Sequence, residues 1–320
     1  MKFMSALSLE TQEDQIVDDL IGQIGDAKGF DLAITFINPD NLDVAEQVFK
    51  GLQDRTQAIH FIGCTAAAII GKTHEVEERP ATSLLVANLP GVHIENISAI
   101  DEIASGVRPD TRACILLVDP FSTDSEELLL HLNELAPAAP VIGGIASWAS
   151  RAGQNRITSN GHTSESGFVG LLLSGNLSIT TVVSQGCRPV GAKYEITASH
   201  GNVIDALDNE SPLEILQDVF AQSSEPDQNL MREGTLVGCG ISSEPHDLGH
   251  GSFLIRGLLG ANTSSGALSV AGRVNIGDIA QFHVRDAGSA RDDLEMLLTP
   301  QAFEVTPSGA LLFTCTGRGH

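Results

Sequence analysis

The feature of this chain that most limits its possible folds is a series of strand-like segments that follow one another without an intervening helix. These short runs, rich in Val, Ile and Leu, occur in adjacent pairs at about 82–88 and 92–99, 167–173 and 177–184, and 252–258 and 267–271. A doubly wound parallel sheet requires strands to alternate with helices. The pattern therefore predicts an α+β fold with mixed, largely antiparallel sheets flanked by helices.

Helical spacing of apolar residues marks five further segments. They are residues 11–24, 42–50, 123–135, 211–221 and 287–298. Thr11, Thr123 and Ser211 have the residue types and positions of N-caps, and Gly51 those of a left-handed C-terminal cap. Polar runs predict loops at 153–167 and 223–229. An apolar run predicts a final strand, buried on both faces, at 309–315.

The charge of the chain excludes two classes of partner. The 320 residues include 18 basic and 41 acidic ones, which gives a formal net charge of −23. Such a surface repels nucleic acid and anionic membranes, so we expect neither as a partner. The N-terminus has no hydrophobic signal region, and apolar stretches such as 66–70 are too short to span a bilayer. We therefore expect a cytoplasmic protein with about two domains.

The cysteines and histidines lack the spacing of a metal site or a disulfide framework. The chain has five cysteines and no CxxC pair. His246 and His250 are four residues apart, but Pro245 and Gly249 oppose a helix there, which favours a loop over a metal-binding helix. We therefore expect no metal ion and no other cofactor.

Two cysteines and two arginines nevertheless have the surroundings of functional residues. Cys64 and Cys187 each follow a glycine, where a thiolate could react, although tight packing at a turn is the favoured interpretation. Arg188 lies in a turn bounded by glycines, and Arg256 lies within an apolar strand. Each guanidinium is expected either to pair with a carboxylate of the protein or to clamp the carboxylate of a small ligand.

Several motifs, in order along the chain, are similar to those of one known family. Its N-terminal block and its centre are matched by GCT at 63–65, GGIAS at 143–147 and VSQGCRPVG at 183–191. Its C-terminal block is matched by FLIRGLLG at 253–260, GDIAQFHVRD at 277–286 and GALLFTCTGRG at 309–319. Over roughly residues 25–320, the chain therefore resembles the FIST family, named for F-box and intracellular signal transduction proteins.

The resemblance implies an organisation into two domains. A helical lead-in at residues 1–25 would precede a FIST N-like domain at 26–190 and a FIST C-like domain at 191–320. Relatives continue past Gly-Arg-Gly through an aromatic, glycine-rich stretch. We therefore expect the C-terminal domain to be incomplete in this chain.

The family is viewed as a sensory module for small ligands, with amino acids suggested, and relatives are fused to or encoded beside histidine kinases and chemoreceptors. The resemblance thus implies a stand-alone, non-enzymatic sensor of an amino acid or small carboxylate in signal transduction. We expect the ligand to be buried where the two domains meet. The residues expected to bind it are Cys64, Thr65, Gly143, Gly144, Cys187, Arg188, Arg256 and Gln281.

Two other classes of function remain open on the sequence. The chain could be an enzyme with Cys64 or Cys187 as its nucleophile, although we assign no catalytic residue. It could also be an assembly or scaffold protein that uses its acidic surface as the binding face. The apolar run at 310–313 predicts an uncovered strand edge, so we further expect a homo-oligomer.

Overall fold

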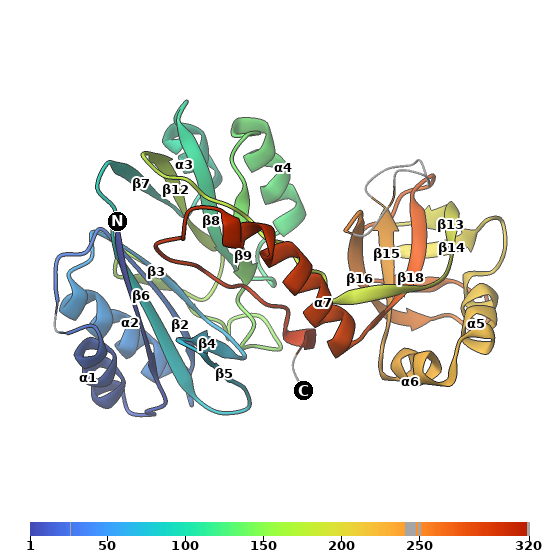
Figure 1. Cartoon of the computed structure of the whole chain (residues 1–320), viewed down its shortest axis with the longest axis horizontal. Coiled ribbons are helices and arrows are strands. Elements are labelled where there is room, and N and C mark those ends of the chain that lie inside the picture. The colour runs from blue at the N-terminus through green and yellow to red at the C-terminus, as the bar shows by residue number, and fades with distance from the viewer. Residues whose placement is uncertain (26, 241–247, 249–250, 319–320) are drawn as a thin grey trace. The chain divides into compact units, whose positions relative to one another are not determined.

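The computed structural model describes residues 1–25, 27–240, 248 and 251–318, and it divides into two compact units (Figure 1). The first unit contains Met1–Thr181 together with the segment that starts at Pro307, and the second contains Val182–Thr306. His246 and His250 lie outside the described residues. In the part of the chain that is described, no helix is both long and apolar enough to cross a membrane.

The first unit is built on two sheets that confirm the predicted fold class. The six-stranded sheet has the spatial order β1 (Lys2–Ser8), β6 (Ala81–Asn88), β2 (Leu32–Asn38), β3 (His60–Thr65), β10 (Ile157–Ser159) and β11 (His162–Ser164). The four-stranded sheet has the order β7 (Val92–Ile97), β12 (Phe168–Gly175), β8 (Thr111–Val118) and β9 (Val141–Ile145). Only the pairs β2–β3 and β8–β9 are parallel among the described strand pairs of these sheets.

The two sheets pack face to face, with helices on their outer faces. Helices α1 (Glu13–Gln23) and α2 (Leu42–Thr56) share one apolar cluster with the six-stranded sheet. Helices α3 (Ile100–Gly106) and α4 (Ser125–Leu135) cover the four-stranded sheet. Because side chains alternate along a strand, β2 supplies residues to both faces, so that the second face joins the cluster between the sheets.

Two predicted helix boundaries are wrong for reasons of packing and capping. Helix α2 continues past Gly51 to Thr56, and a Cβ at Gly51 would lie 2.9 Å from Cγ2 of Val17 on α1. The glycine therefore permits close approach of the two helices, and the left-handed C-cap falls on Gln57 instead. Helix α4 is capped by the carboxylate of Asp124, which accepts from the amides of Glu126 and Glu127.

Several other predicted elements also differ from the structure. Helix α1 begins after Gln12 rather than after Thr11. The loop predicted at 153–167 contains the short hairpin β10–β11, and the strand predicted at 177–184 is not regular secondary structure. The sequence interpretation also did not include β1 and α3.

The second unit is a closed barrel with helices. Its strands follow the order β13 (Cys187–His200), β14 (Val203–Leu207), β17 (Leu268–Val270), β16 (Phe253–Ala261), β15 (Thr235–Gly240) and β18 (Ile279–Arg285). The helices are α5 (Pro212–Gln222), α6 (Glu225–Glu233) and α7 (Ala287–Leu298), followed by the short 3-10 turn η2 (Pro300–Phe303). The Ser211 cap is confirmed, since its hydroxyl accepts from the amide of Glu214. The loop predicted at 223–229 is wrong, because α6 starts there.

The end of the chain returns to the first unit as an extended segment, residues 309–316, called the C-terminal segment below. The strand predicted at 309–315 is wrong, because these residues form no strand. Leu311 and Phe313 are half-buried in the cluster between the sheets, whereas Leu312 is 65% exposed. The ring of Phe313 meets Phe36 of β2 edge to face, with centroids 5.9 Å apart. The apolar run therefore alternates between core and solvent instead of being buried on both faces.

This alternation predicts that two neighbouring substitutions differ in their effect on the free energy of unfolding. Phe313→Ala should lower the free energy of unfolding by roughly 2 kcal/mol, because it removes a half-buried ring from the cluster. Leu312→Ala should change it by less than about 0.5 kcal/mol, because that side chain is exposed. Urea unfolding of both variants checks the prediction, and equal losses would show that the segment is not docked in this register.

Candidate functional site

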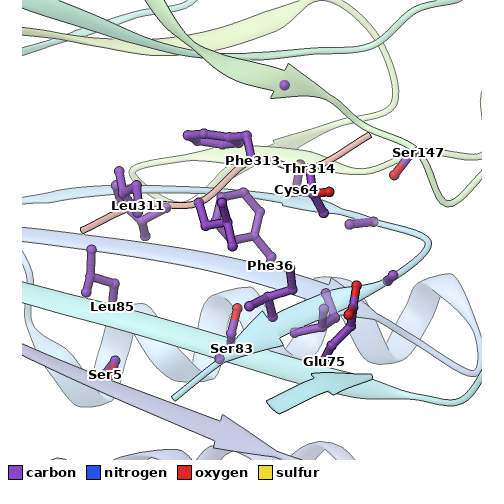
Figure 2. A pocket seen from close by; sticks show the side chains of 18 of the residues that line it. Ser5, Phe36, Cys64, Glu75, Ser83, Leu85, Ser147, Leu311, Phe313 and Thr314 are labelled. Atoms are coloured by element: carbon purple, nitrogen blue, oxygen red, sulfur yellow. The ribbon is translucent and has the colours of Figure 1, made fainter. Parts of the chain in front are cut away.

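A pocket of about 400 Å³ lies within the first unit, on the face of the six-stranded sheet that the helices leave uncovered (Figure 2). Strands β1, β6, β2 and β3 form its base. Its walls are the hairpin β4 (Ile69–Gly71) and β5 (His74–Val76), the ends of β8 and β9, and the C-terminal segment. The pocket therefore lies beside β9, the edge strand of the four-stranded sheet.

The pocket is mainly apolar and contains a few polar groups at separate positions. Apolar side chains from several elements line it, including Ile34, Phe36, Leu85, Leu311 and Phe313. The polar ones include Cys64, Glu75, Glu77, Ser83 and Ser147. Figure 2 shows Glu75 and Ser83 on the side of Phe36 opposite Leu311 and Phe313.

Two of the residues predicted from the sequence, Cys64 and Gly144, line this pocket. Burial raises the pKa of the Cys64 thiol to about 12, so the side chain stays protonated at neutral pH. A Cβ at Gly144 would lie 3.3 Å from Cδ1 of Phe313, so the C-terminal segment packs closely on this glycine. Both residues therefore shape the pocket, and Cys64 does so as a small, uncharged side chain.

Thr65 and Gly143 lie next to these residues but are absent from the described lining of the pocket. The Thr65 hydroxyl accepts from the amide of Arg156 at 3.0 Å. Gly143 lies against β8, where an added Cβ would be 1.8 Å from the carbonyl oxygen of Leu116. Only glycine permits β9 to approach β8 so closely at this point.

A buried polar network, which the sequence interpretation missed, connects the strand ends around the pocket. Asn155 is completely buried, and its amide nitrogen donates to the carboxylate of Asp119 at 2.9 Å and to the carbonyl of Ala146 at 3.0 Å. Its amide oxygen accepts from the backbone of Ala149. The Asp119 carboxylate also accepts from the hydroxyl of Ser122 at 2.6 Å. Because every partner is satisfied, the network fixes the ends of β8 and β9.

The other predicted residues lie in the second unit. Cys187 is buried at the start of β13, and the Gln281 side chain on β18 donates to the carbonyl of Gly191 at 3.1 Å. Arg256 on β16 lies against Gly272, where a Cβ would be 2.4 Å from Nη1 of the guanidinium. Burial raises the pKa of the nearby Cys239 thiol to about 11, although the charge of Arg256 opposes this shift.

Arg188 borders a second, more polar pocket of about 460 Å³ within the second unit. Its guanidinium donates to the carboxylates of Asp227 on α6 and Asp286 before α7, the latter at 3.3 Å. Of the two roles expected for Arg188, the structure thus shows pairing with carboxylates of the protein. The hydrogen bond from Arg188 lowers the pKa of Asp227, and bonds from Ser289 and Gly288 lower that of Asp286.

Comparison with known proteins identifies the chain's relatives. The FIST N domain matches residues 31–210, and the FIST C domain matches residues 212–320. The chain belongs to the FIST family. The boundary between the FIST N and FIST C matches lies inside the second compact unit, between β14 and α5.

Two similar proteins are from mycobacteria. An uncharacterized protein of Mycobacterium tuberculosis is 35% identical over 298 residues, which cover 90% of this chain and 78% of the relative. An uncharacterized protein of Mycobacterium bovis is 33% identical over 300 residues, which cover 90% and 77%. FIST domains are associated with signal transduction and are proposed ligand-binding sensors, and the names of these relatives state no specific function.

The Arg188 ion pairs predict how stability depends on pH. Because the folded-state pKa of Asp227 is lowered, the pairing stabilises the protein above roughly pH 4 and is lost as the pH falls through the folded-state value. The free energy of unfolding should therefore fall less steeply with acidification in Asp227→Asn than in the parent. Asp218→Asn, which alters another carboxylate beside the same pocket, is the matched control. Urea unfolding between about pH 3 and 6 tests this, and parallel curves for all three proteins would contradict it.

Proposed function

We propose that this chain is a non-enzymatic sensory module that binds a small ligand, an amino acid or a small carboxylate, in a signal transduction pathway. The site is the pocket of the first unit, between the six-stranded sheet and the C-terminal segment. The observation that carries the proposal is Ser83, a side chain that is 8% exposed and lines this pocket. Its hydroxyl makes no hydrogen bond with any other described residue, so it is available to a bound ligand.

The size and composition of the pocket support a small-molecule ligand. Its volume of about 400 Å³ falls within the range of small-molecule sites, which are mostly apolar with a few polar groups that orient the ligand. Phe36 and Phe313, whose rings meet edge to face, supply apolar surface, and Cys64 and Gly144 occupy little volume in the lining. Thr65 and Gly143 are proposed to position Cys64 and Gly144 rather than to touch the ligand.

The chemistry of the described lining supports binding rather than catalysis. A cysteine nucleophile must be a thiolate, and burial holds the pKa of Cys64 at about 12. Histidine, the usual general base beside a nucleophile, is missing from the lining as far as the chain is described. Neither component of a cysteine–histidine pair is therefore ready to act at neutral pH.

The route by which binding would produce a signal follows from the order of the chain. The C-terminal segment lines the pocket, and the stretch of chain that leads into it, from Pro307, follows the end of the second unit at Thr306. A ligand that favours one position of this segment shifts the population of conformations by its differential affinity. A signalling protein such as a histidine kinase or chemoreceptor is the proposed recipient. In the second unit, Cys187, Arg188, Arg256 and Gln281 remain proposed ligand contacts.

A thermal-shift screen tests this function with amino acids and small carboxylates. A ligand present at 100 times its dissociation constant should stabilise the protein by about 2.7 kcal/mol, which raises the melting temperature measurably. Ser83→Val should abolish the shift, because it removes the hydroxyl and fills part of the pocket. Ser105→Val, at an exposed position of α3, should keep it.

Two results would contradict the proposal. One is the absence of any stabilising compound in the screen. The other is a stabilising compound whose effect is the same in the parent, Ser83→Val and Ser105→Val proteins, because its site would then lie elsewhere. The melting temperature of each variant without ligand shows that it is folded.

A further inference from the structure

The polar groups of the pocket differ in what they can still bind. The Ser147 hydroxyl accepts a hydrogen bond from the amide of Ala67 at 3.1 Å, so part of its hydrogen-bonding capacity is already used within the protein. Ser83 lies in the middle of β6, opposite Leu7 of β1 and Phe36 of β2, and its hydroxyl can both donate and accept. This hydroxyl, which lines the pocket and has no partner in the described structure, is therefore available to a polar group of a bound molecule.

The described lining of the pocket contains more carboxylates than ammonium groups. Two carboxylates, Glu75 and Glu77, and one ammonium, Lys72, belong to the described lining. Glu77 interacts with another group of the protein. Glu75 forms no ion pair with a described residue, and Figure 2 shows its side chain beside the pocket. Lys72 is exposed in the turn between β4 and β5 and likewise makes no ion pair in the described structure.

The overall charge of the chain acts in the same direction. With a net charge of −23, the protein surface raises the local concentration of small cations and lowers that of small anions. No described arginine borders the pocket, although the guanidinium is the side chain best suited to a ligand carboxylate. The site is therefore better suited to an ammonium group than to a carboxylate, for which the exposed Lys72 is the basic side chain in the described lining.

The rest of the pocket requires an apolar body attached to this charge. In Figure 2, Phe36 lies between Glu75 and the C-terminal segment, and Leu85 and Phe313 add to the apolar lining. A free inorganic cation would leave that surface uncovered, whereas an alkyl chain would cover it. The charge and the apolar surface together specify an amphiphilic molecule.

We infer that the pocket recognises a primary amine with an apolar body, holding the ammonium group at Glu75 and the hydrocarbon chain against Phe36 and Phe313. Ser83 accepts or donates a hydrogen bond at the polar end of this ligand. The inference rests on the proposed ligand-binding function and narrows it, because the recognised group is the amine rather than the carboxylate of an amino acid or small acid.

Three probes of equal length separate the contributions of charge and hydrocarbon. Hexylamine, hexan-1-ol and hexanoate are titrated at pH 7 into the full chain by calorimetry. Hexylamine should bind about two- to fivefold more tightly than hexan-1-ol, because an ion pair with an exposed carboxylate such as Glu75 contributes about that factor. Hexanoate should bind most weakly.

The variants assign this preference to a residue. Glu75→Gln should bind hexylamine and hexan-1-ol about equally, because it removes the carboxylate from an exposed side chain without altering the core. Glu78→Gln makes the same change at an exposed position outside the described lining of the pocket, so it should keep the preference. Ser83→Ala should weaken hexylamine and hexan-1-ol by similar factors and leave their ratio intact.

The outcomes distinguish failure of this inference from failure of the proposed function. Hexanoate binding as tightly as hexylamine, or a preference for hexylamine that survives Glu75→Gln, overturns the inference and leaves a ligand-binding site. Failure of all three probes also overturns the inference. The proposed function is overturned as well only if the screen of amino acids and carboxylates finds no ligand.

Discussion

Burial of the apolar face of the six-stranded sheet is the constraint on which the first unit depends. One face of this sheet packs on α1 and α2, and the other meets the four-stranded sheet, which ends at β9. Beside that edge, the hairpin β4–β5 and the C-terminal segment cover strands β1, β6 and β2. These smaller elements do not fill the volume that a further strand would occupy, and the pocket is the space that remains.

The same constraint explains why the two glycines of β9 differ in their effect. Gly143 lets β9 lie against the backbone of β8, and Gly144 lets Phe313 approach from the other side. The network around Asn155 and Asp119 then fixes the strand ends, because a buried carboxylate and amide must keep all their partners. A rigid base and a wall formed by a segment without strand pairing are the two properties that a ligand-responsive site needs.

Sequence patterns predicted those features of the fold that depend on residues close together in the sequence. The fold class and the Ser211 cap were predicted correctly, because alternation and capping are local signals. Helix α6 was missed, since its only buried residue is Met231 and its composition is that of a polar loop. Strand β1 was missed as well, although Met4 and Ala6 alternate with Phe3 and Ser5, because its identity depends on pairing with β6.

The candidate site was predictable only in part for the same reason. The glycine-flanked motifs pointed to Cys64 and Gly144, which line the pocket. Nothing in the sequence around Glu75, Ser83 or Phe313 links these residues, which come together through β5, β6 and the end of the chain. The pairing of Arg188 with Asp227 and Asp286 likewise joins residues far apart in sequence, so both interpretations of that arginine were open beforehand.

Hydrogen exchange measured by mass spectrometry tests most directly whether the C-terminal segment closes an occupied pocket. The measurement compares the full chain with and without saturating hexylamine. The account predicts slower exchange in peptides that cover the C-terminal segment and residues 69–77, with little change in α3 and α4 on the far side of the four-stranded sheet. Unchanged exchange in the C-terminal segment, or protection confined to the second unit, would contradict it.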